Sequence, residues 1–259
     1  SAEPGEIATG RLEVGEGRDG GTVGLPVAVV NGARDGDRLY LQAASDGDEV
    51  NGVGVVTQVV PRLDPASLAG SVIVVGIVNY HGFLVGEHRN PIDDTKLNRS
   101  YPGSHDGTSS ERIAAATYAL ASESDIILDL HQGSTSRMIE EVRVRCGHIL
   151  DQKGPDGQLA RVAPDDGIPT IDPELGGSIG FDEDSISNGV EGVFNVLLAY
   201  GFLDGSVKMD KQTRATGFDQ YGAPAGGIVD FHVDLGDRVA RDDPLFTLTD
   251  VFGTTKVRV

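Results

Sequence analysis

The sequence contains one cysteine, Cys146, no tryptophan and only 5 lysines among its 259 residues. A single cysteine excludes an intramolecular disulfide framework and a cysteine-rich zinc site. No stretch approaches the ~18 uninterrupted apolar residues of a membrane span, and residues 1–30 lack the basic and then apolar layout of a signal peptide. Because 39% of the residues are hydrophobic, we expect a folded, cytoplasmic protein with a real core.

Basic residues are scarce relative to acidic ones. The chain has 27 Asp and 13 Glu against 16 Arg and 5 Lys, and its formal net charge is −19. A field of this sign repels phosphate backbones, which argues against nucleic acid as a partner. Concentrated salt screens such self-repulsion to within roughly 3 Å at about 1 M. We therefore expect the protein to come from a halophile.

Short apolar runs alternate with amphipathic stretches through most of the chain. The predicted strands are 38–44, 71–79, 125–130, 141–146 and 169–175, and the predicted helices start at Asp48, Ser109 and Phe181. Several of the strands are apolar on both faces, as buried strands are. We expect an α/β fold of three layers, in which helices cover both faces of a mostly parallel or mixed sheet. Sites in such sheets form beyond the carboxyl ends of the strands.

The character of the sequence changes near residue 205. Beyond it, Gly-Gly, Leu-Gly-Asp and Phe-Gly turns separate short β-like runs without a helical period. The pattern predicts an α/β domain over 1–204 and a small β module over 205–259. The module has too few strands to close a sandwich or barrel, so we expect that it is truncated or that a partner completes it.

Polar side chains gather at four places where predicted strands end. Taken singly, Asp46 and Glu49 read as solvated acids, and His131 reads as a core histidine. Asn98–Arg99 reads as a turn with an ion pair, and Glu174 as an acid at a strand end. The four segments are SDGDEVNG (45–52), KLNRSYPG (96–103), DLHQG (129–133) and ELGG (174–177). The other histidines, interpreted as structural or surface residues, are His81, His88, His105, His148 and His232.

Taken together, the four segments match the parts of a metal-dependent amide hydrolase. Asp46 and Glu49 lie close together in the chain and His131 follows far along it, which is the short-spacer, long-spacer layout of catalytic zinc ligands. Three protein ligands leave a position for water, whose pKa zinc lowers to around 7. Glu174 is the candidate base that takes the water's proton and delivers it to the leaving amine.

Two arginines supply the remaining parts of this chemistry. Arg99 offers a planar pair of donors that can hold a substrate carboxylate. Arg89 is a second cation, a candidate for stabilising the developing oxyanion.

These segments resemble the signatures of the succinylglutamate desuccinylase/aspartoacylase family, zinc deacylases related to the zinc carboxypeptidases. The family's His-Gly-Asp-Glu corresponds to residues 46–49, and its Asp-Leu-Asn-Arg-x-Phe-Pro-Gly to 96–103. Its strand-end Asp-Leu-His corresponds to 129–131, and its glutamate ahead of glycines to 174–177. Residues 77–91 and 189–203 and the Gly-Gly hairpin near 226 also resemble family segments, so that the likeness covers 22–259.

The resemblance implies a zinc-carboxypeptidase-like fold and one zinc ion per chain. The implied metal ligands are Asp46, Glu49 and His131. The implied catalytic residues are Glu174 and Arg89, and the implied substrate-binding residues are Asn98 and Arg99.

Two residues depart from the family's pattern. Asp46 stands where the family has histidine, and two carboxylate ligands make the metal a weaker Lewis acid and favour harder ions. Lys96 stands where the family has aspartate, although Asp93 and Asp94 lie close enough in sequence to take over its orienting role.

Three functions are compatible with these features. The leading one is a metal-dependent amidohydrolase that removes the acyl group from an N-acyl amino acid or a similar small carboxylate-bearing amide. A zinc carboxypeptidase is a second, although the family's C-terminal β module is expected to narrow access to the site. A third is a catalytically weakened or inactive relative that binds a carboxylate ligand. The expected partner is a small molecule, and a homo-oligomer is compatible with the sequence.

Overall fold

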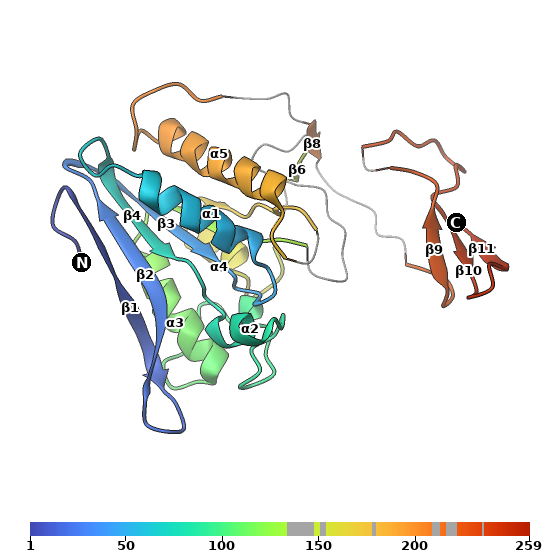
Figure 1. Cartoon of the computed structure of the whole chain (residues 1–259), viewed down its shortest axis with the longest axis horizontal. Helices are drawn as coiled ribbons and strands as arrows, with labels where there is room; N and C mark the ends of the chain where they lie inside the picture. Colours follow the sequence, from blue (N-terminus) through green and yellow to red (C-terminus); the bar gives the residue numbers. More distant parts are fainter. Residues whose placement is uncertain (134–147, 151–153, 178–179, 209–212, 216–221, 235) are drawn as a thin grey trace. The chain divides into compact units, whose positions relative to one another are not determined.

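The structure is a computed structural model, shown in Figure 1. It describes residues 1–133, 148–150, 154–177, 180–208, 213–215, 222–234 and 236–259. The chain divides into two compact units, Ser1–Thr216 and Gly217–Val259, whereas the composition already changes near residue 205. The strand expected at 141–146 lies outside the described residues.

A six-stranded mixed sheet forms the centre of the first unit (Figure 1). In spatial order its strands are β1 (Glu6–Glu16), β2 (Thr22–Asn31), β4 (Ala69–Val75), β3 (Arg34–Ala43), β5 (Ile126–Leu130) and β7 (Thr170–Ile171). β4, β3, β5 and β7 pair in parallel, and β1 and β2 pair antiparallel. Parallel neighbours require crossover connections, which explains the helices between these strands. The β1–β2 hairpin was not among the expected elements, because most of β1 is exposed and carries no buried apolar run.

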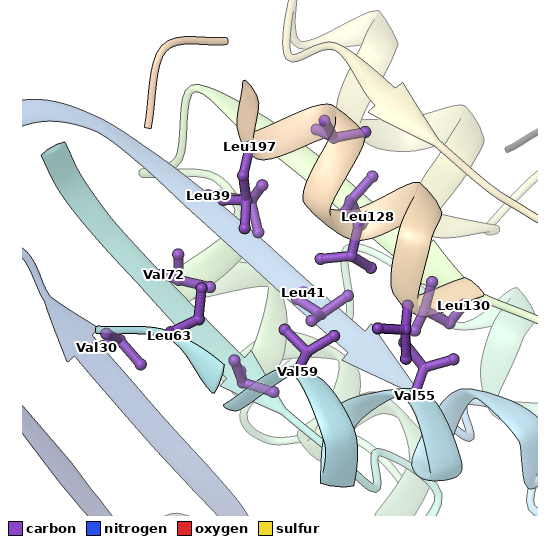
Figure 2. Close-up of a cluster of buried hydrophobic side chains, with 14 of the residues drawn as sticks. Val30, Leu39, Leu41, Val55, Val59, Leu63, Val72, Leu128, Leu130 and Leu197 are labelled. Carbon is purple, nitrogen blue, oxygen red and sulfur yellow. The ribbon is translucent and has the colours of Figure 1, made fainter. Parts of the chain in front are cut away.

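Helices cover both faces of the sheet, so the expected three-layer fold is confirmed. α1 (Asn51–Val59) and α5 (Glu183–Ala199) pack on one face, and α3 (Ser109–Ala121) and α4 (Leu159–Asp165) on the other. Successive side chains of β3 point to opposite faces of the sheet, so the core has two clusters. Leu39 and Leu41 belong to the first cluster, on the face covered by α1 and α5, and Tyr40 belongs to the second, on the face covered by α3 and α4. Figure 2 shows side chains of the first cluster, including Val55 and Leu128, between the strands and helices.

Several of the expected elements begin or end at other residues than predicted. The first helix starts at Asn51 rather than Asp48, and the Gln132 side chain accepts a hydrogen bond from the Asn51 N–H at 2.7 Å. β4 ends at Val75, because Asn79 caps the short helix α2 (Tyr80–Val85) by accepting from the Gly82 N–H at 3.0 Å.

α3 is fixed at its start by two capping interactions. Thr108, not a serine, is its N-cap and forms a reciprocal capping box with Glu111. Asp93 accepts bonds from the backbone N–H of Ser110 at 2.6 Å and from its hydroxyl at 2.9 Å. Partial burial would raise the pKa of Asp93, but hydrogen bonds from Ser110, Thr108 and Thr95 hold it below its usual value. Asp93 therefore anchors α3.

Two further sheets are small. β6 (His148–Leu150) and β8 (Thr213–Ala215) pair in parallel. In the second unit, β9 (Ile228–Phe231), β10 (Phe246–Thr249) and β11 (Thr255–Arg258) form an antiparallel sheet with β10 in the middle. Among the described residues, no helix is both long enough and apolar enough to cross a bilayer.

The turn between β3 and α1 lies against the backbone of α2 and of the segment that follows it. A Cβ atom on Gly47 would lie 2.4 Å from the carbonyl carbon of Gly82 and 2.5 Å from the carbonyl oxygen of Glu87. The Gly47 N–H also donates to the carbonyl of His88 at 3.3 Å. Only glycine permits this close approach of two backbones.

Replacing Asp93 by Asn should lower the free energy of unfolding by about 1 kcal/mol near neutral pH, because one accepting oxygen at the start of α3 is lost. A lowered folded-state pKa means that the contribution is present above the unfolded value of about 3.9 and is lost as the pH falls through the folded value. Urea unfolding at several pH values should therefore show the difference shrinking in acid. Asp94→Asn is the control, because the Asp94 side chain is 92% exposed; an equal loss there would refute the capping role.

Replacing Gly47 by Ala should cost about 1–3 kcal/mol of stability, because the added methyl group meets backbone atoms that cannot move independently. Denaturant unfolding measures the loss. Gly10→Ala in β1 is the matched control, since a Cβ there meets nothing within 4 Å. Equal stability of the two variants would show that the turn adjusts freely.

Candidate active site

Three neighbouring parallel strands bring the candidate residues to one edge of the sheet. β3 leads into Asp46 and Glu49, β5 leads into His131, and the chain after β7 continues to Glu174. His131 and Glu174 form a parallel backbone bridge, in which the His131 carbonyl accepts from the Leu175 N–H at 2.8 Å. The expected convergence at the carboxyl ends of the strands is therefore observed.

The turn that follows β3 has a strained backbone. Ala44 has φ 51°, a left-handed conformation that costs a residue with a Cβ roughly 1–2 kcal/mol. Its carbonyl accepts from the Asn79 N–H at 2.7 Å, and the Ala43 carbonyl accepts from Val78 at 3.0 Å. Such strain persists where the surrounding structure enforces it, and it is common at functional sites. Here it turns the chain so that Asp46 enters the site.

Asp46, Glu49 and His131 lie together and are nearly buried, with 2%, 5% and 3% of their surfaces exposed. His131 Nδ1 lies 2.8 Å from a carboxylate oxygen of Glu49 and 3.8 Å from one of Asp46. The backbone N–H of Gln132 also donates to Glu49, at 3.0 Å. The structure therefore brings the three predicted metal ligands into one cluster.

The other ring nitrogen of His131 faces a second carboxylate. Nε2 lies 3.2 Å from Asp129, which in turn accepts from the Gln42 side chain at 2.8 Å. Gln42 donates to the Tyr101 hydroxyl as well, at 3.1 Å. A histidine whose outer nitrogen is held by a hydrogen-bonded carboxylate is the usual arrangement of a metal-binding imidazole. Nδ1 is then the nitrogen directed at the two acids.

The cluster carries an excess of buried negative charge. Burial alone would lower the pKa of His131, but Asp129, Asp172 and Glu49 raise it well above its ordinary value. Burial raises the pKa of Glu49, and the nearby charge of Asp46 raises it further, while His131 lowers it. Groups displaced in these directions mark a position that favours a cation, whether a proton or a metal ion.

Two basic side chains that were not predicted to be at the site contact Asp46. His88 Nε2 lies 3.3 Å from one carboxylate oxygen, and Lys96 Nζ lies 3.6 Å from the other. His88 was interpreted from sequence as structural or surface. No local pattern identifies it, because its position depends on the tertiary contact between Gly47 and the segment after α2.

The residues present fit a divalent metal ion. Within the part of the chain that the structure describes, Asp46, Glu49 and His88 offer ligand atoms that all lie within 4.8 Å of one another. Oδ1 of Asp46 is buried and accepts no hydrogen bond, which is costly for a carboxylate oxygen unless a cation satisfies it. Oxygen and imidazole donors suit zinc, and a larger share of carboxylate favours harder ions.

Asn98 is the substrate-binding candidate that lies nearest the cluster. Its amide nitrogen lies 3.4 Å from Asp46 and 3.3 Å from His131 Nε2. Arg99 follows it on the exposed side and donates to the Asn98 carbonyl.

The cation proposed for the oxyanion is less closely associated with the cluster. The side chain of Arg89 is 57% exposed and donates to the carbonyl of Asp94, whose carboxylate lies 4.0 Å away. Asp93 binds Ser110. Asp93 thus binds residues at the start of α3, and Asp94 binds Arg89; the orienting role expected of them from sequence stays a prediction.

Glu174 is half-buried beside His131, on the strand-like segment that ends the sheet. The next residue, Leu175, accepts from the Asn51 side chain at 2.8 Å, which ties this segment to the start of α1. The same asparagine accepts from the Asp182 N–H at 2.8 Å. Asn51 therefore joins the three segments that carry Glu49, Glu174 and α5.

The sequence also matches a known family. Residues 35–149 match the model described as the Succinylglutamate desuccinylase/Aspartoacylase catalytic domain. This range contains Asp46, Glu49, Asn98, Arg99 and His131. The N-alpha-acetyl-L-2,4-diaminobutyric acid deacetylase of Halomonas elongata is 27% identical over 263 residues, which cover 89% of this chain and 75% of that protein.

Solved structures share the fold across almost the whole chain. The product-bound ectoine utilization protein EutE (DoeB) of Ruegeria pomeroyi superimposes with a TM-score of 0.89, at 24% identity, over 100% of this chain and 88% of that one. A succinylglutamate desuccinylase of Silicibacter sp. TM1040 gives 0.87, at 22% identity, over 100% and 87%. At these identities the superpositions establish the fold, and the family match adds the motifs. The match over residues 35–149, the curated deacetylase relative and the shared fold together support the succinylglutamate desuccinylase/aspartoacylase family.

Proposed function

We propose that the protein is a zinc-dependent amidohydrolase that removes the acyl group from a small N-acyl amino acid. The observation that carries this proposal is the buried cluster of Asp46, Glu49 and His131, with Glu174 on the adjacent backbone. The named function of the Halomonas elongata relative, a deacetylase of an N-acetylated diamino acid, supports the substrate class.

Asp46, Glu49 and His131 would hold one zinc ion. A zinc ion bound there supplies Lewis-acid chemistry, in that it polarises an amide carbonyl and makes a bound water more acidic. Asp129 holds Nε2 of His131 and so keeps Nδ1 directed at the acids.

Glu174 is the proton carrier of the proposed reaction. Its carboxylate takes a proton from the attacking water and delivers it to the nitrogen of the leaving amine, so that the amine departs neutral. Its half-buried position outside the three-residue cluster suits a base that is near the ligands without being one of them.

Asn98 and Arg99 orient the substrate. The guanidinium group of Arg99 is exposed and can accept a carboxylate through two parallel bonds, which lysine cannot do. Arg89 lies next to His88 and would stabilise the oxyanion once it exchanges its contact with Asp94 for the substrate.

A weakened relative that only binds a carboxylate ligand is the second candidate, and one contact favours it. Lys96 places an ammonium group 3.6 Å from Asp46, where the family has an acid. A side-chain cation beside the first ligand competes with a metal ion for that carboxylate. This candidate predicts binding without turnover.

Metal content and a substrate panel together test the function. We expect the purified protein to retain about one zinc per chain and to release amine from an N-acyl amino acid. The panel would contain Nα-acetyl-L-2,4-diaminobutyrate, N-succinylglutamate and an N-acyl aspartate, and a C-terminally free peptide would test for carboxypeptidase activity. A chelator should abolish turnover and added zinc should restore it. Ligand binding without metal or turnover would instead identify the weakened relative, and peptide trimming alone would identify a carboxypeptidase.

Replacing Glu174 by Gln should lower the turnover number by about 10²–10⁴, because the amide keeps the shape of the side chain and removes the base. Zinc content and the Michaelis constant should change little, since Glu174 is not proposed to bind either metal or substrate. Steady-state kinetics and metal analysis measure the two effects. Glu183→Gln, at an exposed acid in the first turn of α5, is the control. Full activity in Glu174→Gln would exclude the proposed base.

A further inference from the structure

His88 is held at the site by backbone contacts rather than by its own sequence neighbours. Its carbonyl accepts from the Gly47 N–H at 3.3 Å and from the Asn79 side chain at 3.3 Å. Gly47 is adjacent to Asp46, and Asn79 also bonds the strained turn at Ala44. The backbone of His88 is therefore fixed to the same turn that carries the first predicted metal ligand.

The imidazole of His88 has the environment of a metal ligand. Nδ1 lies 2.9 Å from a carboxylate oxygen of Asp48, and since an ionised carboxylate only accepts, Nδ1 carries the proton. Nε2 then faces Oδ1 of Asp46, at 3.3 Å, where its lone pair would be available to a metal ion. Asp48 thus plays for His88 the part that Asp129 plays for His131.

A cation bound between Nε2 of His88 and Oδ1 of Asp46 would satisfy both atoms. Oδ1 of Asp46 accepts no hydrogen bond, although only 2% of the residue is exposed. The 3.3 Å between Nε2 of His88 and Oδ1 of Asp46 would allow both atoms to reach one zinc ion at about 2.0–2.2 Å.

We propose that His88 is a fourth protein ligand of the metal, with Asp48 as its orienting partner. The inference rests on the metal site of the proposed function and adds a residue to it. Asp46, Glu49, His88 and His131 would form a set of two carboxylates and two imidazoles. Zinc accepts a fifth ligand, so this set leaves a position for water. His88 would thereby supply the imidazole that is lost where aspartate occupies the first ligand position.

A set of single substitutions tests the proposal through metal affinity, which does not require turnover. Zinc affinity would be measured by competition with a chromophoric chelator for the whole chain and for His88→Gln, Asp48→Asn and His131→Gln. The control is His105→Gln, at an exposed histidine after the Pro-Gly turn. Thermal unfolding of the metal-free proteins shows that each variant is folded.

We expect His88→Gln to weaken zinc binding by more than 100-fold and Asp48→Asn by about 10–100-fold, the usual effect of losing a partner of a ligand. His105→Gln should bind zinc as the parent does. X-ray absorption at the zinc edge should count two imidazoles in the parent and one in His88→Gln.

The failure of this inference is distinguishable from the failure of the proposed function. Parent-like affinity and an unchanged imidazole count in His88→Gln, with affinity lost in His131→Gln, would overturn the role of His88 alone. It would leave His88 as an ion-pair partner of Asp46 and Asp48. Absence of zinc binding in the parent would overturn both proposals.

Discussion

The burial of several carboxylates around one imidazole is the constraint on which the site depends. Asp46, Glu49 and Asp129 are almost inaccessible to water and all lie within 4 Å of His131. Uncompensated buried charge is costly, so such a cluster persists only if a proton, a side-chain cation or a metal ion balances it. Each element of the surrounding fold can be understood by what it does to hold these acids close together in spite of their repulsion.

The fold meets this constraint mainly with backbone contacts and neutral side chains. Parallel pairing of β3 with β5 aligns the strand ends, and the amide of Gln42, on β3, binds Asp129, on β5, across the pair. In the turn after β3, the Gly47 N–H donates to the carbonyl of His88, so a backbone hydrogen bond holds His88 beside Asp46. Neutral donors can satisfy carboxylates without adding charge, which leaves the cation position for an ion.

The parts of the site that follow from local sequence were predictable, and those that depend on tertiary contact were not. Apolar runs followed by polar turns indicate strand ends, and parallel strands must end at one edge, so the meeting of Asp46, Glu49 and His131 was foreseeable. His88 was not, because nothing in its neighbours shows that Gly47 lies against them. The same limit applies to the start of α1, which is set by the distant Gln132, and to the exposed hairpin of β1 and β2.

The two departures from the family's pattern are in contact, and this changes how each should be interpreted. Asp46 replaces a histidine and Lys96 replaces an acid, and the two side chains form an ion pair of 3.6 Å. Residues that share a contact do not act independently, so the effect of aspartate at the first ligand position depends on the lysine and on His88 beside it. Replacing a neutral imidazole by a carboxylate changes the local charge by −1. Replacing an acid by lysine changes it by +2. The two changes together shift the local charge by one positive unit relative to the family's pattern, and the Lys96 ammonium group competes with a metal ion for the Asp46 carboxylate.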